Sequence, residues 1–180
     1  MNLFTRWAKR EYSLGQRLLA VLPAGVLFVF LIPWMLVRLG PRLDTLLGLP
    51  QLTFGIGNLV LGGLLILLGA FFGIWSNVME IGHARGTPLP VMPTQTLLIS
   101  GPFRYCRNPM SFGALTIYLG VAVAVGSISS IAIALLLAAL LITYLKRIEE
   151  RELEARFGQA YLDYKAGTPF ILPKIISRRH

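Results

Sequence analysis

Cysteine, histidine and charged residues are scarce in this chain of 180 residues. It has one cysteine, Cys106, which excludes a disulfide framework. That cysteine and the two histidines are too dispersed for a metal cluster, so we expect no metal site. Charged residues make up 14% of the chain, whereas soluble domains usually contain about 25%. Because 55% of the residues are apolar, we exclude disorder, and the length of the chain favours a single domain.

Acidic residues are also few: 8, against 17 basic ones, which gives a net charge of +9. In a soluble protein such an excess would suggest nucleic acid as a partner. In a chain this apolar, the anionic face of a membrane is the first candidate instead. The positions of the basic residues decide between the two.

Three stretches lack charge altogether: residues 18–37, 45–79 and 110–145. A helix crosses the hydrocarbon core in about 20 residues, so the third stretch is long enough for two crossings. Gly126 to Ser130 favours a turn in its middle. The sequence therefore predicts an all-α integral membrane protein with about four transmembrane helices, of which the last two form a hairpin. The predicted spans are Leu18–Val37, Thr53–Met79, Pro109–Val125 and Ser130–Arg147.

The basic residues predict the orientation of these spans. Fifteen of the 17 fall in the two terminal segments and the 80–108 loop, and the other two, Arg38 and Arg42, in the first loop. Both termini and that loop are therefore expected in the cytoplasm, which for a bacterial protein means the inner membrane. Nucleic acid is not needed to explain the charge, and membrane lipids are the expected surroundings.

Residues 1–17 predict an interfacial segment and not a signal peptide. Phe4, Trp7, Leu14 and Leu18 recur at helical spacing beside basic residues, which is typical of a helix lying in the membrane interface. Anchoring of the first span and recruitment of lipid are both compatible with this pattern. The remaining organisation is two spans over 18–79, a core over 80–173 and a basic tail over 174–180.

Glycines and two asparagines mark the second span. Gly69 and Gly73 form a small-xxx-small pair, which lets another helix approach closely and allows either a monomer or a homodimer. Asn58 and Asn77 are costly at membrane depth unless they are hydrogen bonded. We interpret both as links between helices and not as substrate contacts.

The 80–108 loop carries four prolines and ends in Arg107-Asn108-Pro109. Prolines at this density indicate an ordered path. Asparagine at the N-cap followed by proline at N1 favours a helix start. The amides of that helix start could hold a negative or polar ligand group, or could simply begin a span. Cys106 lies beside Arg107, which could lower its pKa, but we interpret it as a spectator.

The last span continues beyond the membrane to Phe157, where Gly158 is a natural stop. Glu149 and Glu150 are expected near the water–lipid boundary, close to the start of the preceding span. Arg147 is placed to attract Glu150. Such a charge run is usually a solvated face, and a functional role requires a ligand cation nearby.

The chain resembles the isoprenylcysteine carboxyl methyltransferase and phospholipid methyltransferase group of membrane enzymes. The resemblance covers about residues 80–173, which would form the methyltransferase core. The residues that carry it occur in the family's order: Gly86-Thr87-Pro88, Gly101-Pro102-Phe103-Arg104-Tyr105, Arg107-Asn108-Pro109-Met110, Glu149-Glu150, Phe157-Gly158-x-x-Tyr161-x-x-Tyr164, Pro169 and Pro173.

The resemblance implies S-adenosyl-L-methionine as the cofactor, bound at the cytoplasmic edge of the last two spans. It implies methyl transfer to a lipid-like or isoprenoid-type substrate. Glu149 would face the amino group of the cofactor. The other implied cofactor-binding residues are Gln95, Thr96, Leu97, Leu98, Phe103, Asn108, Pro109, Met110 and Ser111.

Three positions differ from the family's pattern. Asn108 and Ser111 stand where many members have histidine and tyrosine. Leu145 stands where the prenylcysteine enzymes have an arginine for the substrate carboxylate, which disfavours that acceptor.

Arg107 and Glu150 are the candidate catalytic residues. Arg107 could hold a carboxylate, and Glu150 could accept a proton from an amine acceptor. Two alternatives stay open: a nicotinamide-dependent membrane reductase that shares the scaffold, and a non-catalytic membrane assembly protein.

Overall fold

The computed structural model describes residues 15, 19, 22–23, 25–82 and 96–174, and every regular element in these residues is helical. The predicted all-α class is therefore confirmed. The predicted interfacial segment 1–17 lies outside the described residues apart from Gly15, and the basic tail lies outside them apart from Lys174. The elements are η1 (Val26–Leu31), α3 (Ile32–Leu47), α4 (Ile56–Gly82), η2 (Gly101–Arg104), α5 (Pro109–Val125), α6 (Ile128–Tyr144), η3 (Leu145–Glu149), α7 (Glu150–Phe157) and α8 (Gln159–Gly167).

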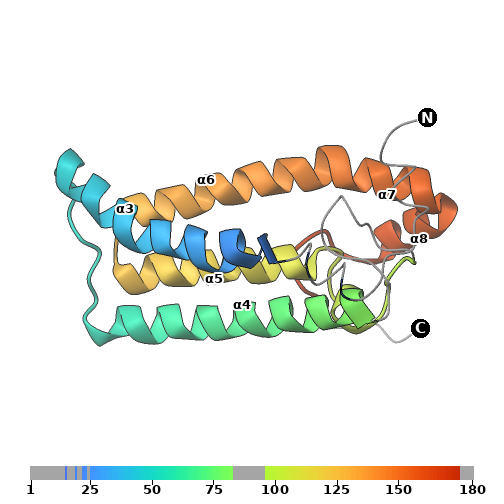
Figure 1. Cartoon of the computed structure of the whole chain (residues 1–180), viewed down its shortest axis with the longest axis horizontal. Coiled ribbons are helices and arrows are strands. Elements are labelled where there is room, and N and C mark those ends of the chain that lie inside the picture. The colour runs from blue at the N-terminus through green and yellow to red at the C-terminus, as the bar shows by residue number, and fades with distance from the viewer. Residues whose placement is uncertain (1–14, 16–18, 20–21, 24, 83–95, 175–180) are drawn as a thin grey trace.

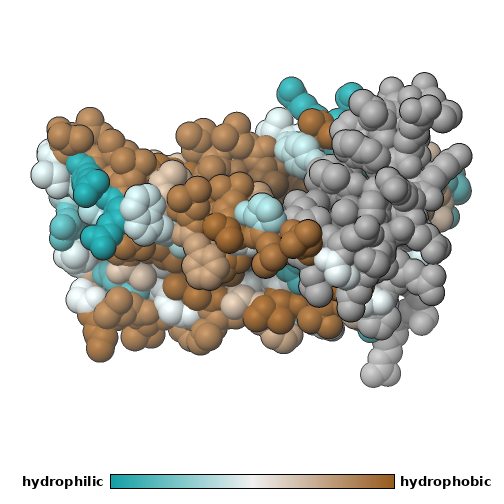
Figure 2. Space-filling view, in the orientation of Figure 1, coloured by the Kyte–Doolittle hydropathy of each residue, from teal (hydrophilic) through white to brown (hydrophobic). Residues whose placement is uncertain are grey.

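Three helical stretches are long and apolar enough to cross a membrane: Val26–Leu47, Ile56–Gly82 and Ile128–Phe157. Helix α5 is shorter, at 17 residues, which is the lower limit for a span. The four helices α3, α4, α5 and α6 run alongside one another (Figure 1). A broad hydrophobic surface covers their length (Figure 2), and large apolar side chains such as Leu64, Leu67 and Leu140 are exposed on it. Such a surface belongs in lipid, and the chain is an integral membrane protein.

The hairpin of α5 and α6 has the predicted boundaries for α5, while α6 begins two residues earlier than expected. Gly126 ends α5 in a left-handed conformation with φ of 68°. Ser127 follows as the N-cap of α6, and its hydroxyl accepts a hydrogen bond from the Ser130 amide at 3.1 Å. The turn is therefore shorter than the predicted one.

The first span extends beyond its predicted end. We predicted that it ends at Val37, before Arg38, but α3 continues to Leu47 and passes through Pro41. The far end of α3 is tied to the hairpin, because Asp44 Oδ1 accepts a hydrogen bond from the Ser129 amide at 2.8 Å. A carboxylate at the start of α6 satisfies amides that would otherwise have no partner. This interhelical cap explains why the helix extends beyond its charges.

Helices α4 and α5 pack closely through glycines, as the small-xxx-small pair predicted. A Cβ atom on Gly69 would lie 2.5 Å from the Gly113 carbonyl oxygen, and one on Gly113 would lie 2.7 Å from the Gly73 nitrogen. The predicted link through Asn58 is confirmed, since its amide donates to the Val123 carbonyl of α5 at 2.8 Å. The link predicted for Asn77 is wrong: its amide donates to Gly73 in its own helix, at 2.9 Å.

We predict that Gly69→Ala destabilises the protein by about 1–3 kcal/mol, because the added methyl group meets backbone that cannot move away easily. Gly63→Ala is the matched control in the same helix, since a Cβ atom there has no neighbour within 4 Å. Thermal unfolding of both variants in detergent measures the difference. Equal unfolding temperatures would contradict the close approach of α4 and α5.

Candidate active site at one end of the helix bundle

The motif residues that the structure describes gather at one end of the bundle (Figure 1). The C-terminal end of α4, the turn η2, the start of α5 and the η3–α7–α8 segment lie there. Helix α4 ends at Gly82 and not at Met79, so the predicted loop begins later than expected. The α5–α6 turn lies at the opposite end of the bundle, away from these motifs (Figure 1).

Asn108 occupies the predicted N-cap of α5, but its side chain does not cap the helix. Its amide donates instead to the Phe170 carbonyl at 2.9 Å. Pro109 is fully buried at the first helical position. The first-turn amides, at Met110 and Ser111, thus receive no side-chain cap, which leaves the helix start able to hold a polar or negative group.

The C-terminal segment folds back over the loop that precedes α5. Hydrogen bonds join the two: the Arg107 amide donates to the Pro169 carbonyl (2.9 Å), the Lys174 amide to the Tyr105 carbonyl (3.0 Å), and the Tyr164 hydroxyl to the Phe103 carbonyl (2.6 Å). The Phe170 ring lies beneath two cations, with Lys146 Nζ at 5.0 Å and the Arg107 guanidinium at 5.6 Å from its centre. The loop before α5 and the C-terminal segment therefore contribute to one site.

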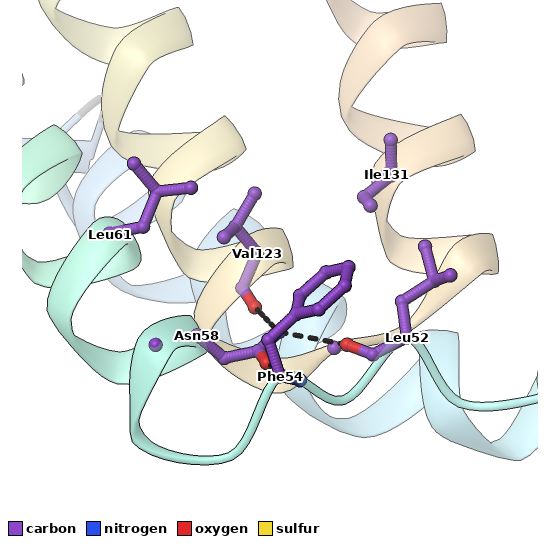
Figure 3. Close-up of a pocket in the computed structure, with 8 residues that line it drawn as sticks. Leu52, Phe54, Asn58, Leu61, Val123 and Ile131 are labelled. Carbon is purple, nitrogen blue, oxygen red and sulfur yellow. Dashed lines mark hydrogen bonds between the residues drawn. The ribbon is translucent and has the colours of Figure 1, made fainter.

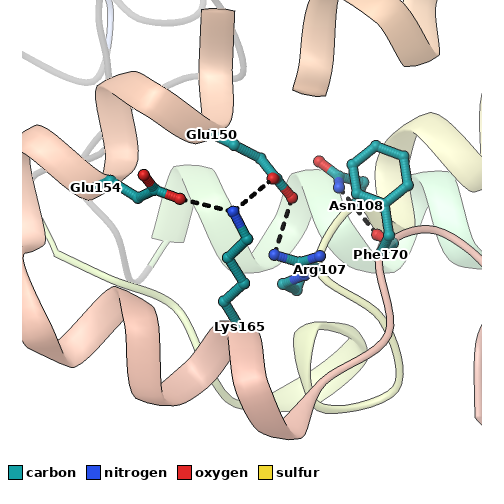
Figure 4. Close-up of polar contacts among 6 residues, drawn as sticks. All are labelled: Arg107, Asn108, Glu150, Glu154, Lys165 and Phe170. Carbon is teal, nitrogen blue, oxygen red and sulfur yellow. Dashed lines mark hydrogen bonds and ion pairs between the residues drawn. The ribbon is translucent and has the colours of Figure 1, made fainter. Parts of the chain in front are cut away.

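Glu150 is the centre of a buried ion network (Figure 4). Its Oε1 lies 2.8 Å from Arg107 Nη1, and its Oε2 lies 2.9 Å from Lys165 Nζ. Lys165 also contacts Glu154 at 2.6 Å. The side chains of Arg107 and Glu150 are 10% and 11% exposed. Glu150 thus pairs with residues far along the chain, and the expected attraction to Arg147 in the same helix is replaced by these contacts.

Arg107 keeps unused hydrogen-bonding capacity in this network. Its Nε and Nη1 atoms and Glu150 Oε1 are buried without a hydrogen-bond partner. Nη1 and Oε1 therefore attract as charges at 2.8 Å without the alignment of a hydrogen bond. Buried donors of this kind usually have partners. A ligand carboxylate is one group that would supply them.

Glu149 and Glu80 supply two further carboxyl groups at this end of the bundle. In the described residues Glu149 has no ion-pair partner, and the charges of Glu152 and Glu150 repel it. The charge of Glu149 in turn repels that of Glu80, whose Oε2 is buried without a hydrogen-bond partner. Desolvated carboxylates without a partner are costly. The arrangement therefore favours a positively charged ligand.

Cys106 is fully buried, and burial raises the pKa of its thiol to about 11. The lowered pKa considered from its neighbour Arg107 is therefore wrong. A thiol with such a pKa stays protonated at pH 7 and is a poor nucleophile. The interpretation of Cys106 as a spectator is consistent with this environment.

The other predicted cofactor-binding residues differ in how far they are buried in the protein. Gln95 lies outside the described residues. Thr96 is exposed, and Leu97, Leu98, Met110 and Ser111 are half-buried. Phe103 is buried, and its carbonyl is held by Tyr164. In the described part of the chain, no group of three or more His, Cys, Asp or Glu side chains is arranged to hold a metal ion.

Sequence reasoning did not single out Glu80, Lys165 and Phe170 as site residues. Glu80 was assigned to a loop, although it lies in the last turn of α4. Tyr161, Tyr164 and Pro169 belonged to the motif set, and their spacing was the available signal for a folded C-terminal segment. Helix α8 places Lys165 against Glu150, which no local pattern specifies.

A cavity of about 270 Å³ lies at the opposite end of the bundle, near the α5–α6 turn (Figure 3). Asn58 organises its wall by donating to the Leu52 and Val123 carbonyls, both at 2.8 Å. The cavity is separate from the motif residues and largely apolar. It is lined by Leu52, Phe54, Gly57, Asn58, Leu61, Val123, Gly126 and Ile131.

Comparison with known proteins agrees with the motif set. No curated protein and no solved structure gives a significant match to the chain. The family model of phospholipid methyltransferase matches residues 58–160, which is more than half of the chain and includes α4, α5, α6 and the Glu149–Glu150 pair. The resemblance to this group of membrane methyltransferases is thereby confirmed, and the chain belongs to the phospholipid methyltransferase family.

Proposed function

We propose that the protein transfers a methyl group from S-adenosyl-L-methionine to a lipid-like or isoprenoid-type acceptor at the cytoplasmic face of the membrane. Membership of a family of lipid-directed methyltransferases supports the reaction class. One structural observation carries the proposal further: Arg107 Nε and Glu80 Oε2, of opposite charge, are both buried without hydrogen-bond partners at the same end of the bundle. A ligand with charges of both signs fits these groups.

The residues present fit the cofactor's charged groups. Its ammonium group would be held by Glu149, and its carboxylate by Arg107 or the first amides of α5. The predicted lining consists of Gln95, Thr96, Leu97, Leu98, Phe103, Asn108, Pro109, Met110 and Ser111. When bound, the cofactor would supply a methyl group attached to a positively charged sulfur. Transfer of that group would leave both electrons of the carbon–sulfur bond on sulfur. The residues mainly align the acceptor and exclude water.

The chemistry of the acceptor determines what Glu150 does. A carboxylate acceptor needs no base at pH 7, whereas an amine must lose a proton. Both oxygens of Glu150 already contact cations, at 2.8 and 2.9 Å. In this proposal Glu150 first serves to position Arg107. Its role as a proton acceptor stays a prediction, and it would require one of those two contacts to open.

The distribution of charge supports the cytoplasmic placement. Arg38 and Arg42 lie on α3, on the side of the bundle where the α5–α6 turn lies. Arg104, Arg107, Lys146 and Lys165 lie at the site end, on the turn η2, at the start of α5 and on the η3–α7–α8 segment. Because basic residues are retained in the cytoplasm, the site end is proposed to face it.

The test is incubation of the purified protein in lipid nanodiscs with methyl-labelled S-adenosyl-L-methionine and a membrane-lipid extract. We expect labelled lipid, and saturable cofactor binding that is unchanged in the control Thr143→Ala, an exposed residue on α6 outside the site. Stabilisation by reduced nicotinamide dinucleotide phosphate, without any by the methyl donor, would support a reductase and contradict the proposal. Failure to bind either compound would support a non-catalytic role.

A further inference from the structure

Glu80 has an unusual environment for a polar residue in the last turns of α4. Its neighbours Ser76 and Asn77 satisfy their side chains within the helix, by donating to the Phe72 carbonyl at 2.6 Å and to the Gly73 carbonyl at 2.9 Å. Glu80 does not, because its Oε2 is buried without a hydrogen-bond partner. A carboxylate that is removed from water and left unpaired is destabilising in the free protein. A cationic ligand would compensate this cost.

Three cations near the site already have partners of their own. Arg107 and Lys165 both pair with Glu150, and Lys146 lies over the Phe170 ring. Glu80 and Glu149 have no such partner in the described residues, and a charge on Glu149 disfavours one on Glu80. Two elements distant in sequence, α4 and η3, therefore each place a carboxyl group at the site end of the bundle, and neither group has an ion pair with a basic residue of the described chain.

The chemistry of this pair points to an organic cation. A metal ion would need further ligands, and the described residues contain no group of three suitable side chains. S-adenosyl-L-methionine carries two positive charges, on its ammonium and sulfonium groups, whereas the thioether product carries one. Building on the proposed function, we propose that Glu80 is a specificity-determining residue that recognises the sulfonium charge, while Glu149 recognises the ammonium.

This assignment links the chemistry to product release. In methyl transfer the carbon–sulfur bond breaks, the acceptor's lone pair forms the new bond to carbon, and sulfur becomes neutral. An amine acceptor then loses a proton, and a carboxylate acceptor becomes a neutral ester. With the sulfonium charge gone, the repulsion between Glu80 and Glu149 is compensated by one cation instead of two. The site thus binds the donor more tightly than the product.

Calorimetric binding without acceptor tests the proposal, using S-adenosyl-L-methionine and S-adenosyl-L-homocysteine as the two ligands. Wild-type protein should bind the methyl donor at least about tenfold more tightly than the thioether. Glu80→Gln should weaken donor binding about tenfold and leave thioether binding within about twofold. Asn77→Ala, one turn earlier, is the matched control and should change neither affinity, since the Asn77 amide donates to the Gly73 carbonyl of its own helix.

Three results would overturn the role of Glu80: no preference of the wild type for the donor, no change in Glu80→Gln, or an equal loss for both ligands. An unfolding temperature of unliganded Glu80→Gln at or above that of wild type would show that the variant folds. If wild-type protein binds neither ligand, the proposed function itself fails. A wild type that binds both while Glu80→Gln matches it rejects only this inference.

Discussion

Replacing Glu150 with glutamine is expected to lower the free energy of unfolding by about 3 kcal/mol or more. The carboxylate balances Arg107, whose side chain is 10% exposed, and removing one partner of a buried pair leaves the other charge uncompensated. Lys165 loses less, because its side chain is 35% exposed and it keeps its contact with Glu154 at 2.6 Å. The cost therefore falls mainly on Arg107 and on the start of α5 that follows it.

Unfolding of detergent-solubilised Glu150→Gln by heat or denaturant measures this effect. Glu152→Gln is the matched control two residues away, since its contact with Arg156 is an i,i+4 pair at 3.5 Å on a more exposed face. That control should cost at most about 1 kcal/mol. The double variant Arg107→Gln/Glu150→Gln should recover part of the loss, because neither charge is then left alone. Equal losses for the Glu150 and Glu152 variants would contradict a buried network.

The α5–α6 hairpin could be predicted from the sequence because local signals determine it. Pro109 begins α5 and Gly126 ends it, as predicted, and both residues act through their own backbone conformation. Ser127 then caps the next helix within three residues. Helix α6 begins two residues before its predicted start, because Gly126 and Ser127 alone are enough to form the turn.

The end of the first span could not be located in the same way. The first charged residue, Arg38, predicts an end at Val37, but α3 continues past Arg38 and Pro41, and Asp44 is held by the Ser129 amide of a helix 85 residues later. Long-range contacts of this type leave no periodic signal in the local sequence. Asn77 differs from its prediction for the opposite reason: its type and depth suggested a partner on another helix, but a carbonyl one turn earlier satisfies its amide.

The sequence predicts which residues belong to the candidate site better than it predicts which of them contact one another. The motif set indicated Arg107, Asn108, Glu149 and Glu150, and the structure places them at one end of the bundle. Residues 145–149 form a π-helical turn, η3, which changes the faces that Glu149 and Glu150 present relative to a regular helix. A regular helix was assumed in the prediction, so the partners of Glu150 across the fold were missed.

Glu149→Gln is expected to have the opposite effect on stability from Glu150→Gln, and a larger effect on ligand binding. Among the described residues Glu149 has no cationic partner, and Glu150 and Glu152 repel it. Removing its charge relieves that repulsion, so the unliganded variant should be at least as stable as wild type. The proposed ammonium contact is lost at the same time, which should weaken cofactor binding about 10- to 100-fold.

These two effects predict that the order of the unfolding temperatures of wild type and Glu149→Gln reverses when the methyl donor is added. Without ligand, Glu149→Gln should unfold at or above the wild-type temperature. With the donor at about 100 times the wild-type Kd, wild type gains about 2.7 kcal/mol, and the variant gains much less because its Kd is higher. A donor-induced shift in Glu149→Gln equal to that of wild type would contradict the ammonium contact. Destabilisation of the unliganded variant would instead show that Glu149 has a structural partner. The reversal requires an unpaired carboxylate that a cationic ligand satisfies, whereas a purely structural role predicts the same order in both conditions.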